Sequence, residues 1–293
     1  MKTRAPHSLG GVFLVAVSAV SFGLMPIFAK VAYAAGISTH TLLFLRFSVA
    51  AVLMFALFFA RRLPMPSKKE ILAFLLLGGI GYVGQSFCYC LALNYASSSL
   101  VSLLLYTYPA LVMLGSALAF HERITAKKLI SLVLALAGAF LVIWSEFEAS
   151  LPGILLAVGA ALFYTVYILI SSRVVRADMG VQSSAFIMLG AALVFGGMNL
   201  FLGFTPPAQP SGILAALLIA LVSTVLAIWC FFTGMARTGP TVASLVSTLE
   251  PVVTVLASAV LLSEPVTLSI VLGGVLVLAS LLVTVRPGGM PEG

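Results

Sequence analysis

Charged residues are scarce in this sequence. Only 8% of its 293 residues are charged, whereas 62% are hydrophobic, and the mean hydropathy is +1.22. Such a chain has too few polar side chains to cover the surface of a water-soluble globule, which excludes a soluble domain. The composition is typical of an integral membrane protein, whose first partner is the lipid bilayer.

Residues suited to metal binding or catalysis are also few. The three cysteines and three histidines form no cluster with the spacing of metal ligands, so neither a metal nor another cofactor is expected. The apolar runs contain no paired aspartates and no G-x-S-x-G motif, and the sequence therefore does not indicate an enzyme. The stretch GGIGYVGQ, residues 78–85, lacks a lysine and lies inside an apolar run, so it predicts close helix contacts rather than a phosphate-binding loop.

Long apolar runs, in contrast, fill the chain. A helix needs about 20 apolar residues to cross about 30 Å of hydrocarbon. Ten such runs follow one another with short polar breaks. They predict an all-α membrane protein with ten transmembrane helices, since a transmembrane β-barrel would show short alternating segments. The predicted spans are residues 9–33, 39–60, 70–94, 97–119, 125–145, 151–172, 182–204, 211–235, 240–262 and 266–285.

The basic residues indicate an orientation. With the N-terminus in the cytoplasm, thirteen of the fifteen Lys and Arg residues fall in cytoplasmic segments, and the other two, Lys30 and Arg46, lie within predicted spans. Because basic residues collect on the cytoplasmic side of membrane proteins, both termini are expected there. Their spread over several short segments explains the net charge of +7 without nucleic-acid binding, and no nucleic-acid partner is expected.

The chain contains an internal repeat. A shift of 142 residues aligns identical residues, including the pairs Gly11 and Gly153, Ser102 and Ser244, Pro109 and Pro251, and Glu122 and Glu264. This predicts two five-helix repeats, residues 1–145 and 146–293. Because five is an odd number of crossings, the second repeat is expected upside down relative to the first, with a central cavity between them. Inverted repeats of this kind are typical of carriers that work by alternating access.

Three segments carry a family resemblance. They are FLRFSVAAVLM, TYPALVMLGSALAFHERITAKKLISLVLALAGAFLVI and LEPVVTVLASAVLLSEPVTLSIVLGGVLVLASLLVTV. These segments resemble the paired repeats of the EamA-type transporters of the drug/metabolite transporter superfamily, above all in the spacing from Pro109 to Glu122 and from Pro251 to Glu264. One departure is the proline that follows Glu264, where the first repeat has an arginine after Glu122.

This resemblance implies a ten-helix carrier that exports amino acids or other small metabolites and, in some members, drugs, sugars or nucleotide sugars. The tyrosines and phenylalanines of the predicted pore helices look most like those of the aromatic amino-acid exporter branch. The implied location is the bacterial inner (plasma) membrane. The sequence contains no ATP-binding motif, so uphill transport would draw on an ion gradient or on substrate exchange.

Glu250 is the acidic residue predicted to lie nearest the middle of the membrane. A charged side chain there costs about 2.5–3.5 kcal/mol on insertion scales, so its presence requires a reason. Pro251 removes a backbone donor and is expected to kink the helix, and irregular backbone at this depth is tolerated only beside protein or a wet cavity. The aligned pair Tyr108 and Pro109 predicts an equivalent kink in the first repeat.

Three roles remain open for Glu250. It could contact a substrate ammonium group, titrate a proton in coupled transport, or only hold the kinked helices together through internal hydrogen bonds. The first two roles make it the candidate coupling residue as well as a substrate contact.

Further binding candidates follow from helical spacing. Tyr82, Gln85 and Tyr89 share one helix face, which predicts either a cavity wall or a set of interhelical hydrogen bonds. Tyr106 and Tyr108 are two residues apart, so only one of them is expected to face the interior of a continuous helix. The predicted substrate-binding set is Tyr82, Gln85, Tyr89, Tyr106, Tyr108, Tyr164, Ser244, Thr248 and Glu250, with Pro109 and Pro251 as the helix-kink residues.

The two basic residues within spans have different expectations. Lys30 lies in the outer half of its span, where a long side chain reaches the lipid headgroups. Arg46 lies deeper, and we keep open whether it also reaches outward, pairs with an acidic group or recognises an anion.

We therefore expect a secondary transporter that exports small metabolites, amino acids first and aromatic ones as the finer option, by alternating access. The alternatives are a transporter of sugars, nucleotide sugars or drugs in the same superfamily, or a non-transporting membrane receptor or partner subunit. A small-molecule substrate is the expected second partner, and the sequence carries no signal for an oligomeric state.

Overall fold

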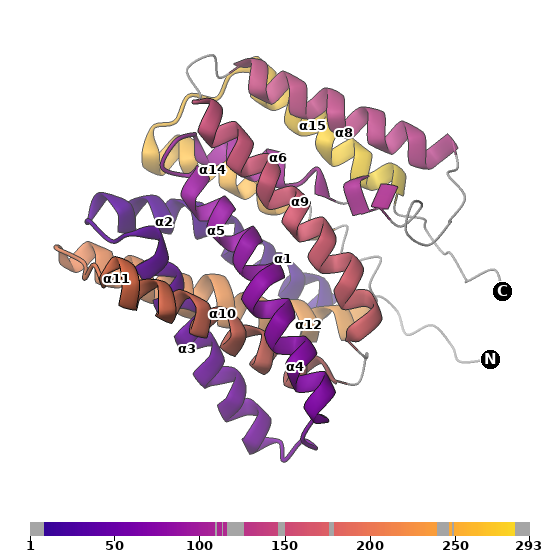
Figure 1. The fold of residues 1–293 in the computed structure, drawn as a ribbon. Coiled ribbons are helices and arrows are strands. Elements are labelled where there is room, and N and C mark those ends of the chain that lie inside the picture. The colour runs from indigo at the N-terminus through magenta and orange to yellow at the C-terminus, as the bar shows by residue number, and fades with distance from the viewer. Residues whose placement is uncertain are drawn as a thin grey trace, which may run out of the picture.

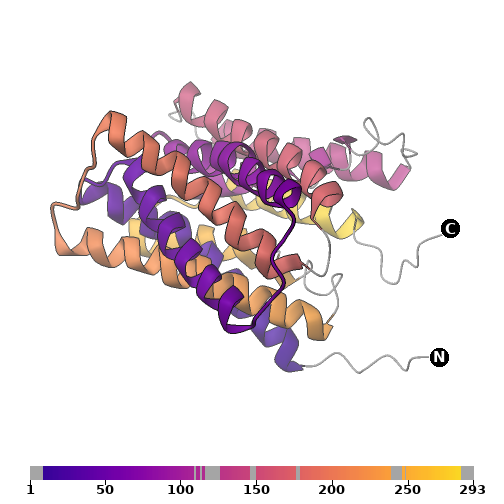
Figure 2. The ribbon, with the colours of Figure 1, turned by 60° about the horizontal axis from the view of Figure 1, so that its bottom comes forward.

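A computed structural model describes residues 9–108, 110–112, 114–115, 126–145, 150–175, 179–238, 246–247 and 249–284. All regular elements in these ranges are helical, and the helices lie side by side in one bundle (Figures 1 and 2). The first half contains α1 (Leu9–Gly23), α2 (Met25–Ala34), α3 (Thr39–Ala60), α4 (Lys68–Leu76), the π-helix η1 (Leu77–Tyr82), α5 (Val83–Ala92), α6 (Ser98–Leu105) and α8 (Ala126–Ser145). The second half contains α9 (Leu151–Val174), α10 (Gly180–Leu202), α11 (Pro210–Ala220), the π-helix η3 (Leu221–Leu226), α12 (Ala227–Thr238), α14 (Leu249–Leu262) and α15 (Leu268–Thr284).

Helical segments occupy the positions of the ten predicted spans. Six segments are long and apolar enough to cross a membrane: Leu9–Ala34, Thr39–Ala60, Lys68–Ala92, Leu151–Ser171, Gly180–Leu202 and Pro210–Met235. Four shorter apolar helices occupy the remaining positions: Ser98–Val112, Leu132–Val142, Leu249–Leu262 and Leu268–Ser280. The chain is thus an all-helical membrane protein with six clear spans, and crossing by the four shorter helices stays a prediction.

Serines start several of these helices. The side-chain oxygens of Ser38, Ser97 and Ser150 each accept a hydrogen bond from the backbone N–H three residues further on, in the first turn of α3, α6 and α9. Ser67 caps α4 in the same way, and the Glu70 side chain accepts from the Ser67 backbone in return. Each cap satisfies a backbone donor that a helix start leaves unpaired.

Two predicted spans are interrupted rather than continuous. The first divides at Leu24 into α1 and α2, and Pro26 lies in the first turn of α2, where a missing N–H costs nothing. In the fourth, α6 ends at Leu105, and helical hydrogen bonds resume when Thr107 accepts from the backbone of Ala110. The hydropathy of these runs gave no sign of either break.

Helix pairing follows the internal repeat. Under the 142-residue shift α3 corresponds to α10 and α8 to α15, and the structure packs each of these helices against its own equivalent. Under the same shift α1 corresponds to α9, and α5 corresponds to α12. The packing is reciprocal, because α1 packs on α12 and α5 packs on α9. Reciprocal pairs of this kind are what a two-fold relationship between the repeats requires.

Glycines allow the closest helix contacts. Gly78 lies against the backbone carbonyl of Ile187, and Gly190 lies against that of Leu75, which joins α10 to α4 and η1. This confirms the role predicted for the glycines of residues 78–85. In the pair α8 and α15, a Cβ at Gly138 would lie 2.6 Å from the carbonyl oxygen of the facing Gly273.

The two ends of the bundle differ. At one end the loop after α2 meets the loop after α10, because the backbone N–H of Ala208 donates to the carbonyl of Ala35 at 2.9 Å. At the other end Arg61 and Arg62 are exposed, and α1 begins and α15 ends there too (Figure 2). Between the ends the outer surface is apolar, as Leu193 in the middle of α10 shows with an exposed fraction of 62%.

Candidate functional site

Glu250 lies where the two halves of the chain meet inside the bundle. It belongs to the first turn of α14, which packs against α1 and α6. The hydroxyl of Tyr106, the residue directly after α6, donates a hydrogen bond to a carboxylate oxygen of Glu250. A carboxylate of the second half is therefore held by a phenol of the first.

Three of the predicted site residues, Pro109, Ser244 and Thr248, lie outside the described residues. Pro251 lies buried in the first turn of α14. Kinks at Pro109 and Pro251 therefore stay predictions.

Tyr106 and Tyr108 both join the interior, contrary to the sequence-based expectation. Their ring centroids are 6.3 Å apart, Tyr106 contacts Glu250, and Tyr108 packs on Tyr164. The expectation assumed one continuous helix. It was wrong because α6 ends at Leu105, so the two side chains no longer alternate around a helix axis.

A row of aromatic rings extends from Tyr106 to α3. After Tyr108, the centroid distances are 4.6 Å for Tyr108 and Tyr164, 6.0 Å for Tyr164 and Tyr167, 5.4 Å for Tyr167 and Tyr82, and 5.4 Å for Tyr82 and Phe47. The rings come from α3, η1 and α9 and from Tyr106 and Tyr108 after α6, hence from both halves. We call this set the aromatic row. Phe47 and Tyr167 were not in the predicted substrate-binding set.

The predicted face of Tyr82, Gln85 and Tyr89 is only partly reproduced. Tyr82 belongs to the aromatic row, whereas Gln85 is buried and accepts a hydrogen bond from its neighbour Ser86 at 3.1 Å. Tyr89 is buried within electrostatic range of both Glu250 and Arg46. A role of this face as a cavity wall stays a prediction.

Arg46 does not reach outward to the headgroups. It is 4% exposed, its Nε donates to Thr224 Oγ1 of η3 at 3.0 Å, and its guanidinium carbon lies 5.0 Å from the centroid of Phe47. Across the described ranges it forms no ion pair. Of the roles left open by the sequence, pairing with an acidic group is therefore absent from this part of the structure.

Lys30 was expected to reach the headgroups, and the structure corrects this. Its ammonium group lies 2.8 Å from Glu264 Oε1, in the loop after α14. The Glu264 carboxylate also accepts from the backbone N–H groups of Ser98 at 3.0 Å and Ser99 at 3.4 Å. It thus caps α6, where the helix dipole favours an anion.

The Glu264 carboxylate is held in its charged form. Burial raises its pKa, but the hydrogen bonds from Lys30 and Ser98 outweigh burial, and the net pKa lies below the usual value. The ion pair of Lys30 and Glu264, with the hydrogen bonds from the Ser98 backbone, joins α2, α6 and the loop after α14. We call this set of contacts the charged latch.

A line of hydroxyl groups continues from this latch toward Glu250. The facing side chains of α6 and α14 are joined pairwise: Ser99 to Ser258 at 3.0 Å, Ser102 to Thr254 at 3.4 Å, and Tyr106 to Glu250. The serines and Thr254 are buried. Sequence reasoning missed these pairs because their partners lie about 150 positions apart, although the spacing 250, 254, 258 along one helix face was visible.

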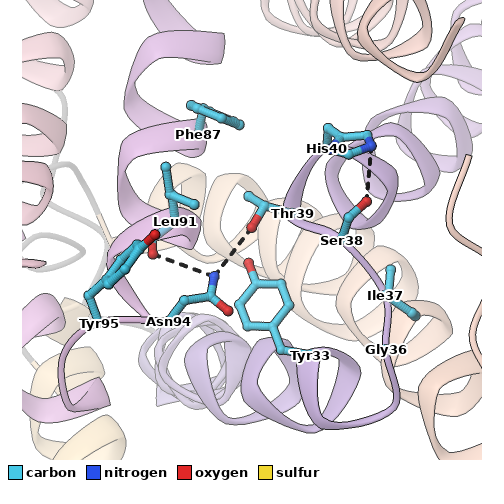
Figure 3. Close-up of a pocket in the computed structure, with 10 residues that line it drawn as sticks. All are labelled: Tyr33, Gly36, Ile37, Ser38, Thr39, His40, Phe87, Leu91, Asn94 and Tyr95. Atoms are coloured by element: carbon cyan, nitrogen blue, oxygen red, sulfur yellow. Dashed lines mark hydrogen bonds between the residues drawn. The ribbon is translucent and has the colours of Figure 1, made fainter. Parts of the chain in front are cut away.

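The described residues also form a pocket at the end where the loops meet (Figure 3). It has a volume of about 480 Å³ and is lined by Tyr33, Gly36, Ile37, Ser38, Thr39, His40, Phe87, Leu91, Asn94 and Tyr95. Figure 3 shows the amide of Asn94 directed at Thr39, to which it donates at 3.3 Å. The Tyr33 hydroxyl donates to the carbonyl of Cys90 at 2.9 Å, which joins α2 to α5 beside the pocket.

This pocket was not expected from the sequence, which predicted a central cavity beside Glu250. Residues 239–245, which precede α14, lie outside the described ranges, so the central cavity stays a prediction. Within the described ranges no three His, Cys, Asp or Glu residues lie close enough together to hold a metal ion.

Comparison with known proteins identifies the family. The sequence matches the EamA-like transporter family twice, over residues 9–144 and 151–286, and the two matches begin 142 residues apart. This confirms the internal repeat.

Relatives and a solved structure agree with this match. The "uncharacterized transporter YcbK" of Bacillus subtilis (strain 168) is 25% identical over 93% of this chain and 91% of its own length. An "uncharacterized transporter" of Haemophilus influenzae is 26% identical over 83% of this chain and 81% of its own. A crystal structure with 18% identity, covering 93% of this chain and 96% of its own, shares the fold with a TM-score of 0.66. The chain therefore belongs to the EamA-like transporter family of the drug/metabolite transporter superfamily and is a membrane transporter rather than an enzyme.

Proposed function

We propose that this transporter is a secondary carrier that exports small metabolites, amino acids first, by alternating access between two inverted five-helix repeats, residues 1–145 and 146–293. The hydrogen bond from Tyr106 to Glu250 carries this proposal. It joins the two repeats inside the bundle, at the end of one helix and the start of another. A carboxylate kept at such a position is a functional group by default in membrane proteins.

The inverted arrangement has structural support. The helix pairs repeat under the 142-residue shift, and α1 begins at the same end of the bundle as α15 ends (Figure 2). A two-fold relationship between the repeats accounts for the first observation, and an even number of crossings requires the second. The exposed Arg61 and Arg62 at that end support, through the positive-inside rule, a cytoplasmic side for this end and for both termini, in a bacterial inner membrane.

The contacts at the opposite end suggest how access is controlled. The charged latch of Lys30 and Glu264 and the hydroxyl pairs of α6 and α14 close the bundle between the outer end and Glu250. When two paired hydroxyl groups separate, each can form a hydrogen bond with water instead, at little cost in free energy. An interface of hydroxyl pairs therefore separates more readily than an apolar one. Opening it would expose Glu250 to the pocket side of the membrane.

Glu250 is the proposed contact for a substrate ammonium group and the candidate for proton coupling. The aromatic row beside it supports amphipathic substrates with a flat apolar part, which favours aromatic amino acids as the finer proposal. Sugars, nucleotide sugars and drugs would need other polar contacts, and they serve as the competing compounds in the test.

Counterflow in proteoliposomes tests the proposal. Proteoliposomes of the purified protein are loaded with unlabelled amino acids, sugars, nucleotide sugars or cationic drugs, and uptake of the matching labelled compounds is measured with and without a proton gradient. We expect uptake of amino acids that is lost or uncoupled from the gradient in Glu250→Gln. Glu70→Gln is the matched control, because Gln keeps the capping box of α4 far from the site.

The outcomes separate the roles of Glu250. Exchange that persists in Glu250→Gln while gradient-driven uptake disappears supports proton coupling, and loss of both supports substrate contact. Uptake of sugars or drugs alone would replace the amino-acid proposal, and no flux of any compound would contradict transport by this site.

A further inference from the structure

The pocket of Figure 3 has the composition of a ligand site. Its volume of about 480 Å³ falls within the range of about 300–1,000 Å³ that small-molecule sites occupy. Three aromatic rings line it, those of Tyr33, Phe87 and Tyr95. Its polar side chains are those of Ser38, Thr39, His40 and Asn94. Apolar walls with a few polar groups are the usual lining of a site for a small organic molecule.

The lining offers hydrogen bonds rather than permanent charges. No Asp, Glu, Lys or Arg is among the described residues that form it. Its one histidine, His40, donates from Nε2 to the carbonyl oxygen of Gly203 at 3.0 Å, because a carbonyl oxygen only accepts. A ligand of this pocket therefore binds through ring contacts and neutral hydrogen bonds, in contrast to the carboxylate of Glu250.

Contacts within the protein hold the polar groups of the pocket in place. Asn94 Nδ2 donates to Thr39 Oγ1 at 3.3 Å and to the carbonyl of Leu91 at 3.5 Å. No described residue donates to the side-chain oxygen of Asn94, which leaves this oxygen to accept from a ligand. The hydroxyl of Tyr33 is fixed on the carbonyl of Cys90. A site whose groups are already ordered loses less entropy when a ligand binds.

The pocket lies beside the charged latch. Tyr33 follows Lys30 by three residues on α2, so the two side chains share a helix face. Ser98, which donates to Glu264, follows Tyr95 by three residues in the chain. The pocket and the latch thus share α2 and the connection from α5 to α6. In the proposed topology this is the outer end, so a molecule released through the parted latch passes the pocket.

Ring contacts join the pocket to the interior. Phe87 packs on the buried Phe195 at a centroid distance of 6.4 Å, and Phe195 stacks on Phe47, the first ring of the aromatic row, at 5.7 Å. Tyr95, in contrast, is 48% exposed, so the pocket also opens to water. It has a wet mouth and a wall that contacts the aromatic row.

We propose that this pocket is a second substrate site, which holds the exported molecule beside the charged latch before release. Its ligands are amphipathic molecules with an aromatic ring and neutral hydrogen-bonding groups: the ring packs on Phe87, and the side-chain oxygen of Asn94 accepts from the polar end. The assignment rests on the proposed function and deepens it, because it adds a site that, unlike Glu250, needs no ammonium group on the ligand.

Protection of an introduced thiol tests the site. In the full-length chain with the three cysteines replaced by serine, Tyr95→Cys places a thiol in the exposed part of the lining, and an impermeant thiol reagent is applied to the outer face of oriented vesicles. Phenylalanine is the first ligand. N-acetylphenylalaninamide keeps the ring without a charge, and N-acetylglycinamide lacks the ring. Gln209→Cys, exposed at the same end but outside the lining, is the matched reporter.

Phenylalanine is expected to slow the labelling of Tyr95→Cys and to leave that of Gln209→Cys unchanged. N-acetylphenylalaninamide should protect at a similar concentration, whereas N-acetylglycinamide should not protect. Phe87→Ala should raise the protecting concentration by about ten-fold, because an aromatic contact is worth about that factor. Phe204→Ala, which removes an exposed ring outside the lining, is the control. Protection should persist in Glu250→Gln, since the pocket does not use that carboxylate.

Four results would overturn the assignment. Intact counterflow of phenylalanine without protection removes the second site and leaves the proposed function standing. Protection that disappears in Glu250→Gln would show that the thiol responds to binding at Glu250. Equal protection of Gln209→Cys would show a change of the whole outer end, and protection by phenylalanine but not by N-acetylphenylalaninamide would contradict the ligand class. These comparisons stand even if Phe87→Ala does not fold. No counterflow of any compound removes the proposed function, and with it the release role of the pocket.

Discussion

The hydroxyl of Tyr106 donates a hydrogen bond to Glu250, and this contact joins the residue that follows α6 in one repeat to the first turn of α14 in the other. An unpaired charge inside a membrane protein is costly. The contact therefore both explains why the acid is tolerated and makes it sensitive to any separation of the repeats.

Removing the phenol hydroxyl tests this contact. Tyr106→Phe leaves Glu250 without its donor and is expected to lower stability by about 1–3 kcal/mol and to reduce transport. Tyr108→Phe keeps the ring that packs on Tyr164 and should have a smaller effect. Thermal unfolding in detergent and counterflow measure both variants.

A double-mutant cycle provides the control. If the two groups interact directly, Tyr106→Phe should cost much less in a Glu250→Gln background than in the wild type. Additive losses would show that Tyr106 and Glu250 act independently.

The latch at the outer end predicts a dependence on pH. Because the pKa of Glu264 is lowered from its usual value of 4.5, the charged carboxylate stabilises the fold above that pH, and the contribution is lost as the pH falls through the lowered pKa. Melting temperature should thus be insensitive to this group from pH 7 to about pH 5 and fall in more acidic buffer.

Lys30→Gln removes the partner of Glu264. We expect a loss of about 1–3 kcal/mol at pH 7, since a half-buried carboxylate loses a charged donor, and a smaller acid-induced fall in melting temperature, because the pKa of Glu264 moves back toward its unfolded value. Lys69→Gln, an exposed position at the other end of the bundle, is the control and should change little. Identical acid profiles for the wild type and Lys30→Gln would contradict the latch.

The crossing of α8 and α15 predicts a steric effect. In Gly138→Ala the new methyl group would lie 2.6 Å from the carbonyl oxygen of Gly273, so the helices must shift, at a cost of about 1–3 kcal/mol. Gly197→Ala is the matched control, because nothing lies within 4 Å of its added Cβ, and helix propensity should stabilise it by about 0.4–1 kcal/mol. Equal melting temperatures for both variants would exclude tight packing of α8 on α15.

The inverted topology predicts which ends face which solution. In a background with the three cysteines replaced by serine, Arg61→Cys and Ala208→Cys should react with a membrane-impermeant thiol reagent from opposite faces. Both positions are exposed, so access to the reagent does not limit the reaction. Labelling of both from one face would contradict the crossing pattern.

The sequence predicted the helix positions and the repeat well, for a physical reason. Apolar runs of membrane length and a fixed 142-residue offset are properties of the chain that need no knowledge of contacts. Contacts between residues far apart in the sequence were harder to predict. Lys30 and Glu264 are 234 positions apart, and a lone lysine near the end of a span has headgroups as its default partner.

Helix breaks account for most of the remaining errors. Pro26 was a visible signal for the division between α1 and α2, whereas the end of α6 at Leu105 had none in the hydropathy. That end brings Tyr106 and Tyr108 into one cluster, which helical spacing would forbid. The π-helices η1 and η3 add another shift of register, since their hydrogen bonds do not follow the period on which the pattern analysis relies.

The central claim is that Glu250 lies at a place reached by water from one side of the membrane at a time. Ser247→Cys, one helical turn before Glu250, tests this in the cysteine-free background, with an impermeant thiol reagent applied separately to each face of oriented vesicles. We predict that the introduced thiol reacts from one face only, and that a transported amino acid changes the rate or the reactive face. Reaction from both faces at once, or from neither face with or without substrate, would contradict the account.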